Sequence, residues 1–262
     1  MEKKFELTNI TKEVCGLTLY QIRALKDFGS VKLGDLGGWI EKESNLDQKG
    51  NAWIFGSARI FGDAWITGNA MISGDARISD SARIFDSARI FGRAWIFGSA
   101  WISDSACITG DAWISGDARI SDSARISGDA RISGNARISD SARISDDARI
   151  SGNARISDSA RISDSARISG DAWITGDARI SGDARVNSTT DYFIFGPIGS
   201  RNAILTVTFS NSKLCTGCFH GSISKFKEAL KGTHSGNQHE TEYNLILDVI
   251  EKLIEVRQNA KD

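Results

Sequence analysis

Ala52-Trp-Ile-Phe-Gly-Ser57 is followed directly by Ala58-Arg-Ile-Phe-Gly-Asp63, and this six-residue pattern continues without insertion or loss through residues 51–188. Alanine fills the first position in all 23 copies, and isoleucine fills the third position in 22 of them. Because these two residues alternate with a period of two, both side chains face one side of a short strand. The repeat therefore predicts short strands that share an apolar inner face.

The fifth position of the repeat predicts a corner after each strand. It is glycine or aspartate in every copy from Gly56 to Gly182. Glycine adopts a left-handed backbone conformation without penalty, and aspartate tolerates it better than most residues. A lone strand of this length cannot bury its inner face, whereas stacked copies form a continuous core. We therefore expect an all-β solenoid over residues 51–188.

The composition limits the class of protein. The net charge of −1 provides no bulk attraction to nucleic acid or to an anionic membrane. No run approaches the ~18 apolar residues that a membrane-spanning helix requires, and the amino terminus carries no secretory-length apolar run. Four scattered cysteines are too few for a disulfide framework. We expect a cytoplasmic protein with no membrane segment and no cofactor.

The outward second position of the repeat is arginine or tryptophan in almost every copy. Between residues 51 and 186 the chain carries 16 arginines and 17 aspartates. One interpretation is that these charges neutralise each other along and across the strands. The alternative is that arginine ladders bind a polyanion, for example Arg125, Arg143, Arg161 and Arg179. Aspartate rows expected beside the ladders argue against nucleic acid as the partner.

Non-repetitive segments flank the solenoid on both sides. An open solenoid end exposes unpaired strand edges, which invite end-to-end association. We therefore expect residues 1–50 to form an N-terminal cap and residues 189–262 to form a small C-terminal α+β capping domain. Within the latter, residues 192–195 and 203–209 read as strands. Ser222 is expected to cap a short helix that runs through Leu230 and is stopped by Gly232, and a longer helix is expected from Asn237.

The C-terminal segment also carries residues with metal-ligand spacing. Cys215 and Cys218 are followed by His234 and His239, which is compatible with a four-ligand structural zinc site. Against this, the two histidines flank a loop, and Cys218 lies in a strand-like run where a buried thiol is an ordinary core residue. The sequence favours no metal and leaves zinc as the alternative.

Parts of the chain resemble known proteins. Residues 27–46, with Gly34-Asp-Leu-Gly-Gly-Trp-Ile-Glu41, followed by Gly50-Asn-Ala-Trp-Ile54, closely resemble the opening of YdcK-like hexapeptide-repeat proteins of enteric bacteria and their prophages. The tail, with Gly196-Pro-Ile-Gly-Ser-Arg-Asn202, is similar to a terminal module of phage-encoded proteins. The resemblance implies a left-handed parallel β-helix with three repeats, about 18 residues, in each turn. A flattened turn of two repeats is the structural alternative.

The resemblance also implies a choice between a scaffold and an enzyme. The family carries an acyltransferase label that rests on the fold alone. Left-handed β-helix acyltransferases generally use a histidine base on the helix and a loop extruded from a turn. Here His220, His234 and His239 all lie beyond the repeat, and no loop interrupts it. Because a general base must reach the proton that it removes, the sequence favours a non-catalytic scaffold, with an acyltransferase as the alternative.

Outward aromatic side chains concentrate in the first half of the solenoid. They are Phe85, Phe91, Trp95, Phe97, Trp101 and Trp113. In an 18-residue turn Trp95 would stack on Trp113 with Phe97 alongside. Exposed apolar patches usually mark interfaces, so these residues predict a protein-interaction surface, either in a homo-oligomer or with a foreign, host-directed partner. The remaining alternative is that the protein's own N-terminal segment covers them.

Overall fold

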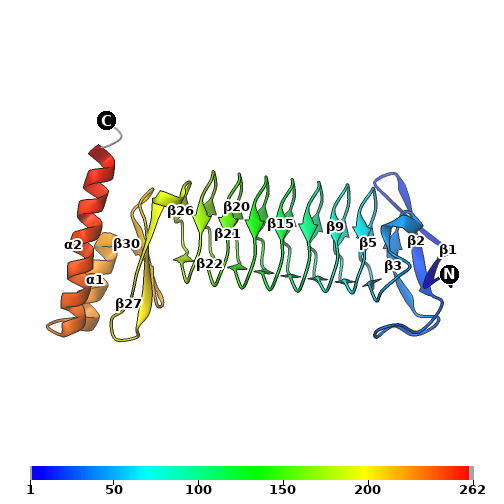
Figure 1. The fold of residues 1–262 in the computed structure, drawn as a ribbon, viewed down its shortest axis with the longest axis horizontal. Helices are drawn as coiled ribbons and strands as arrows, with labels where there is room; N and C mark the ends of the chain where they lie inside the picture. The colour runs from blue at the N-terminus through cyan, green and yellow to red at the C-terminus, as the bar shows by residue number, and fades with distance from the viewer. Residues whose placement is uncertain (1, 260–262) are drawn as a thin grey trace.

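The computed structural model describes residues 2–259, and its centre is a parallel β-solenoid (Figure 1). The strands of the repeat run from β4 (Trp53–Ile54) to β26 (Arg185–Val186), and each is two residues long. Every turn takes 18 residues, as shown by the pairing of Ile114 with Ile132 and of Ile126 with Ile144. The predicted solenoid with three repeats per turn is confirmed, and the flattened two-repeat turn is wrong.

Consecutive strands fall on three faces in rotation, which we call the first, second and third face. The first face contains β5 (Arg59–Ile60), β8 (Arg77–Ile78), β11 (Trp95–Ile96), β14 (Trp113–Ile114), β17 (Arg131–Ile132), β20 (Arg149–Ile150), β23 (Arg167–Ile168) and β26. The second contains β4, β7 (Met71–Ile72), β10 (Arg89–Ile90), β13 (Cys107–Ile108), β16 (Arg125–Ile126), β19 (Arg143–Ile144), β22 (Arg161–Ile162) and β25 (Arg179–Ile180). The third contains β6 (Trp65–Ile66), β9 (Arg83–Ile84), β12 (Trp101–Ile102), β15 (Arg119–Ile120), β18 (Arg137–Ile138), β21 (Arg155–Ile156) and β24 (Trp173–Ile174).

Stacked alanine and isoleucine side chains fill the interior. The repeat alanines and isoleucines are at most 2% exposed, and they form one continuous core along the whole solenoid. Backbone hydrogen bonds join the turns, as from Arg125 N to Ala142 O at 2.9 Å and from Ser127 N to Ile144 O at 2.9 Å. Each isoleucine contributes roughly 1.5–3 kcal/mol by leaving water. This core confirms the inward period of two.

The corners have the backbone conformation that the fifth position predicts. Asp122 has a φ of 58° and Gly134 a φ of 68°, both in the left-handed region. The corner aspartates also form hydrogen bonds: the Asp122 N–H donates to Asp104 Oδ2 of the preceding turn at 3.3 Å, and within the same corner Ser121 Oγ donates to Asp122 Oδ2 at 2.9 Å. Aspartate at this position therefore supports the corner with hydrogen bonds that glycine cannot make.

The N-terminal segment extends the first face. It contains β1 (Phe5–Val14), β2 (Leu17–Ala24), β3 (Leu36–Ile40) and the short helix η1 (Glu43–Asn45). β1, β2 and β3 are antiparallel neighbours, and β3 pairs in parallel with β5. Asn45 Nδ2 donates to the backbone oxygens of Gly62 at 3.0 Å and Ala64 at 2.8 Å. The pairing of β3 with β5 and the hydrogen bonds of Asn45 therefore provide partners for many backbone groups at the open edge of the first turn.

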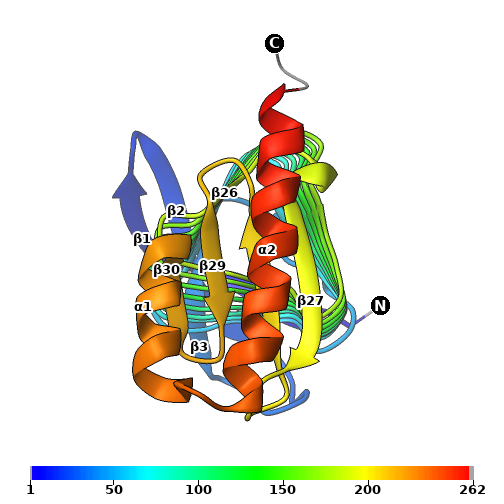
Figure 2. The ribbon, with the colours of Figure 1, turned by 90° about the vertical axis from the view of Figure 1, so that its left-hand side faces the viewer.

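The C-terminal segment folds as a sheet covered by two helices. It contains η2 (Thr189–Asp191), β27 (Tyr192–Ile198), β28 (Ala203–Thr208), β29 (Lys213–Thr216), β30 (Phe219–Ser222), α1 (Ile223–His234) and α2 (Gln238–Asn259). The antiparallel four-stranded sheet lies between the last turn and the helices (Figures 1 and 2). The predicted stop at Gly232 is wrong, because α1 continues to His234. Among the described residues, no helix combines the length and apolar composition that crossing a bilayer requires.

Side chains of this sheet form hydrogen bonds with backbone groups of the last turn of the solenoid. Thr206 Oγ1 accepts from Arg179 N at 3.0 Å, and Tyr192 Oη donates to Trp173 O at 3.1 Å. On the far side of the sheet a second, separate core is formed by side chains such as Leu214, Phe226 and Leu247. The sheet therefore seals the solenoid with one face and supports the helices with the other.

Candidate functional site

The first face carries a compact group of aromatic side chains, which we call the aromatic cluster: Trp95, Phe97 and Trp113. Trp95 and Trp113 occupy neighbouring rungs, and their ring centroids are 4.7 Å apart. Phe97 lies 5.5 Å from Trp113 and 6.0 Å from Trp95. The two tryptophans are 36% and 40% exposed. The predicted stacking is confirmed, and the cluster presents apolar surface to solvent.

The other three predicted aromatic residues lie on other faces. Trp101 belongs to the third face, where its ring meets Phe85 at 5.6 Å and lies between the guanidinium groups of Arg83 and Arg119. Phe91 directly follows β10 of the second face. The structure therefore distributes the six aromatic residues over three faces of the solenoid. Strand residues stack on the same face only when they are 18 positions apart in the sequence, as Trp95 and Trp113 are.

The N-terminal segment leaves the aromatic cluster uncovered. Its strands extend the sheet beyond β5, and the segment lies at the end of the solenoid (Figure 1). The surroundings of the cluster instead carry charges of both signs. The guanidinium of Arg77 lies 5.4 Å from the centre of the Trp95 ring, and Arg93 forms an ion pair with Asp111. The hydrogen bond to Asp111 raises the pKa of Arg93.

Arginine columns follow the second and third faces, with different neighbours. On the second face Arg125, Arg143 and Arg161 occupy successive rungs and line a groove of about 770 Å³. The other side chains that line this groove in the described part of the chain are Arg89, Cys107 and several serine, threonine and isoleucine residues, with no carboxylate among them. The third-face groove instead includes Asp117 and Asp171 beside its arginines. The same repeat therefore yields one face with a cationic groove and another with mixed charge.

Neutralisation of arginine by aspartate was one of two interpretations of the sequence, and in the described part of the repeat the arginine ladders form no close ion pairs. In the described part of the repeat, the ion pair between an arginine and an aspartate is Arg93–Asp111. Corner carboxylates accept backbone N–H groups of the next turn instead, as Asp140 Oδ2 accepts from Asp158 N at 3.3 Å. At the left-handed corners these carboxylates point toward the neighbouring turn. The aspartate rows therefore form hydrogen bonds with backbone N–H groups and not with the arginine side chains.

The residues with metal-ligand spacing do not converge. Cys215 Sγ lies 3.3 Å from Ser181 Oγ, and burial raises the pKa of its thiol, which opposes the thiolate that a metal needs. Cys218 lies in an exposed turn, so the strand expected there is wrong. The rings of His234 and His239 are 5.5 Å apart. Across residues 2–259, no three histidine, cysteine or acidic side chains gather closely enough to hold a metal ion.

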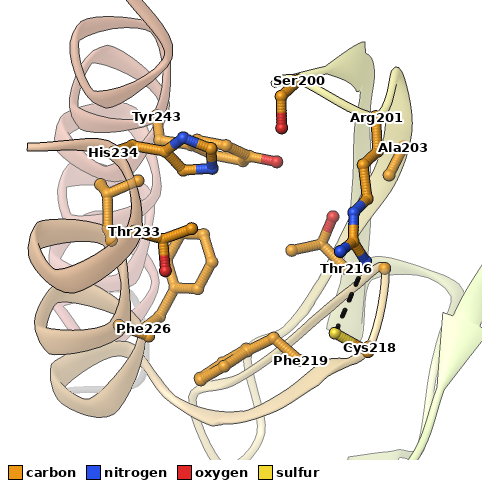
Figure 3. A pocket seen from close by; sticks show the side chains of 13 residues that line it. Ser200, Arg201, Ala203, Thr216, Cys218, Phe219, Phe226, Thr233, His234 and Tyr243 are labelled. Carbon is orange, nitrogen blue, oxygen red and sulfur yellow. Dashed lines mark hydrogen bonds between the residues drawn. The ribbon is translucent and has the colours of Figure 1, made fainter. Parts of the chain in front are cut away.

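The C-terminal sheet and helices enclose a cavity that the sequence did not indicate (Figure 3). Its volume is about 200 Å³. It is lined on one side by α1 and α2 with Phe226, His234 and Tyr243, and on the other by sheet residues that include Arg201 and Thr216. These residues are separated along the chain, so no local sequence motif indicated the cavity.

Comparison with known proteins agrees with the geometry of the repeat. The family described as YdcK Beta solenoid repeat matches four overlapping stretches, residues 124–140, 130–146, 142–158 and 148–164. The repeats in this part of the chain are therefore similar to the YdcK β-solenoid repeat. A 37-residue stretch is also 51% identical to the "Uncharacterized acetyltransferase YdcK" of Escherichia coli (strain K12). That match covers 14% of this chain and 11% of the relative, so the chain spans only a small part of the relative's length.

Proposed function

We propose that this protein is a non-catalytic scaffold that associates with a second copy of itself through the aromatic cluster. The observation that carries the proposal is the exposed contact among Trp95, Phe97 and Trp113 on an otherwise polar face. Contiguous exposed aromatic groups are typical of interfaces, where tryptophan contributes much of the binding energy. An uninterrupted solenoid provides the rigid support that such a surface needs.

The position of the cluster favours a second copy as the partner. Nine rungs form the parallel part of the first-face sheet, from β3 to β26, and the cluster occupies the fourth and fifth. A two-fold axis through it would overlay the two faces along most of their length, which is ~38 Å at ~4.8 Å per rung. Charges of both signs beside it, such as Arg93 and Asp111, suit a self-complementary contact.

The test compares two double variants of the full chain by light scattering during size-exclusion chromatography. Trp95→Ser with Trp113→Ser removes the cluster, and we expect it to be monomeric while the wild type is dimeric. Trp65→Ser with Trp173→Ser is the matched control, because these residues are 44% and 50% exposed on the third face. The control should remain dimeric.

Other outcomes also decide the proposal. A cluster variant that still dimerises removes the cluster as the interface. A monomeric wild type excludes self-association. If that monomer captures a host protein that the cluster variant fails to capture, the interface belongs to a foreign partner, as the resemblance to prophage proteins would imply.

We also propose, as a second candidate, that the second face binds an extended polyanion. Its groove presents Arg125, Arg143 and Arg161 at one rung spacing with hydroxyl groups beside them. No aromatic ring lines the described groove, and stacking platforms are typical of single-strand nucleic-acid binders. An anionic polysaccharide therefore fits better than nucleic acid.

The two arginine grooves provide the test of this second candidate. Replacing Arg125, Arg143 and Arg161 with glutamine should abolish salt-dependent binding of a polyuronate such as alginate. The same changes at Arg119, Arg137 and Arg155 on the third face should alter it far less, because Asp117 and Asp171 already oppose anions there. Equal losses in both variants, or preferential binding of single-stranded DNA, would contradict the proposal.

The name of the E. coli relative suggests acetyl transfer as the enzymatic alternative. The repeat of this chain carries no histidine that could act as the general base. A rise in the melting temperature with millimolar acetyl-coenzyme A would favour an enzyme over the scaffold. We expect no rise.

A further inference from the structure

We propose that the cavity between the C-terminal sheet and α1 and α2 binds a small carboxylate ligand with a flat apolar body. The cavity has a volume of about 200 Å³ and lies apart from the aromatic cluster and from the arginine grooves. The inference is therefore independent of the proposed scaffold function. Figure 3 shows the side chains that point into the cavity.

Aromatic rings form the apolar part of the cavity. Phe219 lies 5.0 Å from Phe226, and Phe226 lies 5.3 Å from Tyr243 in an edge-to-face arrangement. Phe226 and Tyr243 are only 5% and 7% exposed. An apolar cavity of about 150 Å³ is large enough for benzene, so the observed volume admits one ring with a small substituent. Drug-sized ligands need larger pockets.

Thr216 places a polar group inside this apolar space. The residue is 7% exposed, and its Oγ1 has no hydrogen-bond partner among the described residues. Figure 3 shows the hydroxyl directed toward the interior of the cavity. Buried hydroxyl groups without partners are rare in proteins because their desolvation is not compensated. An oxygen atom of a bound ligand would provide the missing partner.

Arg201 supplies a cation at the mouth of the cavity. Within the described chain, its hydrogen bond goes to the thiol of Cys218 at 3.8 Å, which is a weak acceptor. A guanidinium group binds a carboxylate through two parallel hydrogen bonds, and this pairing is stronger than a neutral one. A single arginine beside neutral Ser200 and aromatic walls suits one negative charge on an otherwise apolar molecule.

The chain geometry holds the mouth in place. Gly199 has a φ of 70°, and a Cβ atom there would lie 2.4 Å from Tyr243 Oη. Glycine therefore allows the turn that carries Ser200 and Arg201 to approach the tyrosine ring. On the opposite wall, Ser222 Oγ caps α1 by accepting from Lys225 N at 3.3 Å. That helix then places Phe226 and His234, two turns apart, along the cavity.

The experiment titrates the full-length protein with benzoate and, separately, with its neutral analogue benzamide, using isothermal calorimetry and amide NMR shifts. We expect saturable benzoate binding at millimolar or lower concentration and at least tenfold weaker binding of benzamide. Arg201→Gln should weaken benzoate binding at least tenfold, since it removes a charge-assisted contact. Arg167→Gln, on the exposed first face, is the matched control and should bind like the wild type.

Thr216→Val provides the second variant. It keeps the shape of the side chain and removes the hydroxyl, so the ligand-free protein should be at least as stable as the wild type while benzoate binding falls several-fold. Equal affinity for benzoate and benzamide, or unchanged binding by Arg201→Gln, would overturn the assignment of a carboxylate site. Failure of the wild type to bind either molecule would overturn the ligand site altogether.

Discussion

The solenoid and the C-terminal sheet with its helices hold their cores together in opposite ways. In the solenoid each inward position repeats the one 18 residues before it, so alanine packs on alanine and isoleucine on isoleucine. In the C-terminal segment leucine, isoleucine, valine, phenylalanine and tyrosine side chains form the core without a repeating order, and the packing leaves a cavity of about 200 Å³. A repetitive core therefore confines recognition to its outer columns, whereas an irregular core can enclose a ligand.

The largest expected effect is a cavity in the repetitive core. Ile126→Ala should lower the free energy of unfolding by about 3–4 kcal/mol, because a fully buried isoleucine is lost between two neighbouring turns. Ile114→Ala and Ile144→Ala should cost the same within about 0.5 kcal/mol, as their surroundings repeat. Urea denaturation measures all three. A wide spread among them would mean that the turns are not equivalent.

The next largest difference is expected between alanine substitutions at two glycines that both have positive φ, one in the solenoid and one in the C-terminal segment. Gly134→Ala should cost about 3 kcal/mol, since φ is 68° and the added Cβ would lie 2.7 Å from Gly152 O in the next turn. Gly217→Ala, in the turn between β29 and β30, has a φ of 55° but open space around the Cβ, so about 1 kcal/mol is expected. Similar losses in thermal unfolding would show that stacking of the turns adds no constraint.

The pH dependence of stability should reveal a buried lysine at the N-terminal end. Burial lowers the pKa of Lys4 from 10.5 to about 8, although Nζ donates to Ala52 O at 3.0 Å. The unfolded chain therefore binds more protons between these pH values, and stability should rise with pH across that window by on the order of 1 kcal/mol. Urea titrations of Lys4→Met should show no such rise. This comparison separates the contribution of Lys4 from that of other titrating groups.

The smallest effect is expected from removing a whole turn. Deleting residues 127–144 joins Ile126 to Ser145, which keeps every later residue on its face. The free energy of unfolding should change by less than about 1 kcal/mol, and benzoate binding in the C-terminal cavity should persist. Circular dichroism and calorimetry check both. Loss of folding would show that the number of turns is itself required.

Much of the solenoid could be read from its residues because local pattern and global packing coincide there. Alanine and isoleucine two apart specify the inner face, and glycine or aspartate at the fifth position specifies the corner, as Asp122 and Gly134 show. The stacking of Trp95 on Trp113 followed from the same period. In the C-terminal segment, by contrast, α1 continues beyond Gly232, where the sequence predicted its end. Packing against the sheet outweighs the low helix propensity of one glycine.

The sequence by itself determined the repeat, its inner and outer positions and the stacking of residues 18 apart, because these depend only on periodicity. The tertiary structure decided which outward residues share a face. It separated Trp101 and Phe91 from the aromatic cluster, and among the described residues it placed no carboxylate in the groove of Arg125, Arg143 and Arg161. It also brought Arg201, Thr216 and Tyr243 around one cavity. Such contacts between distant positions arise from packing, which no local pattern encodes.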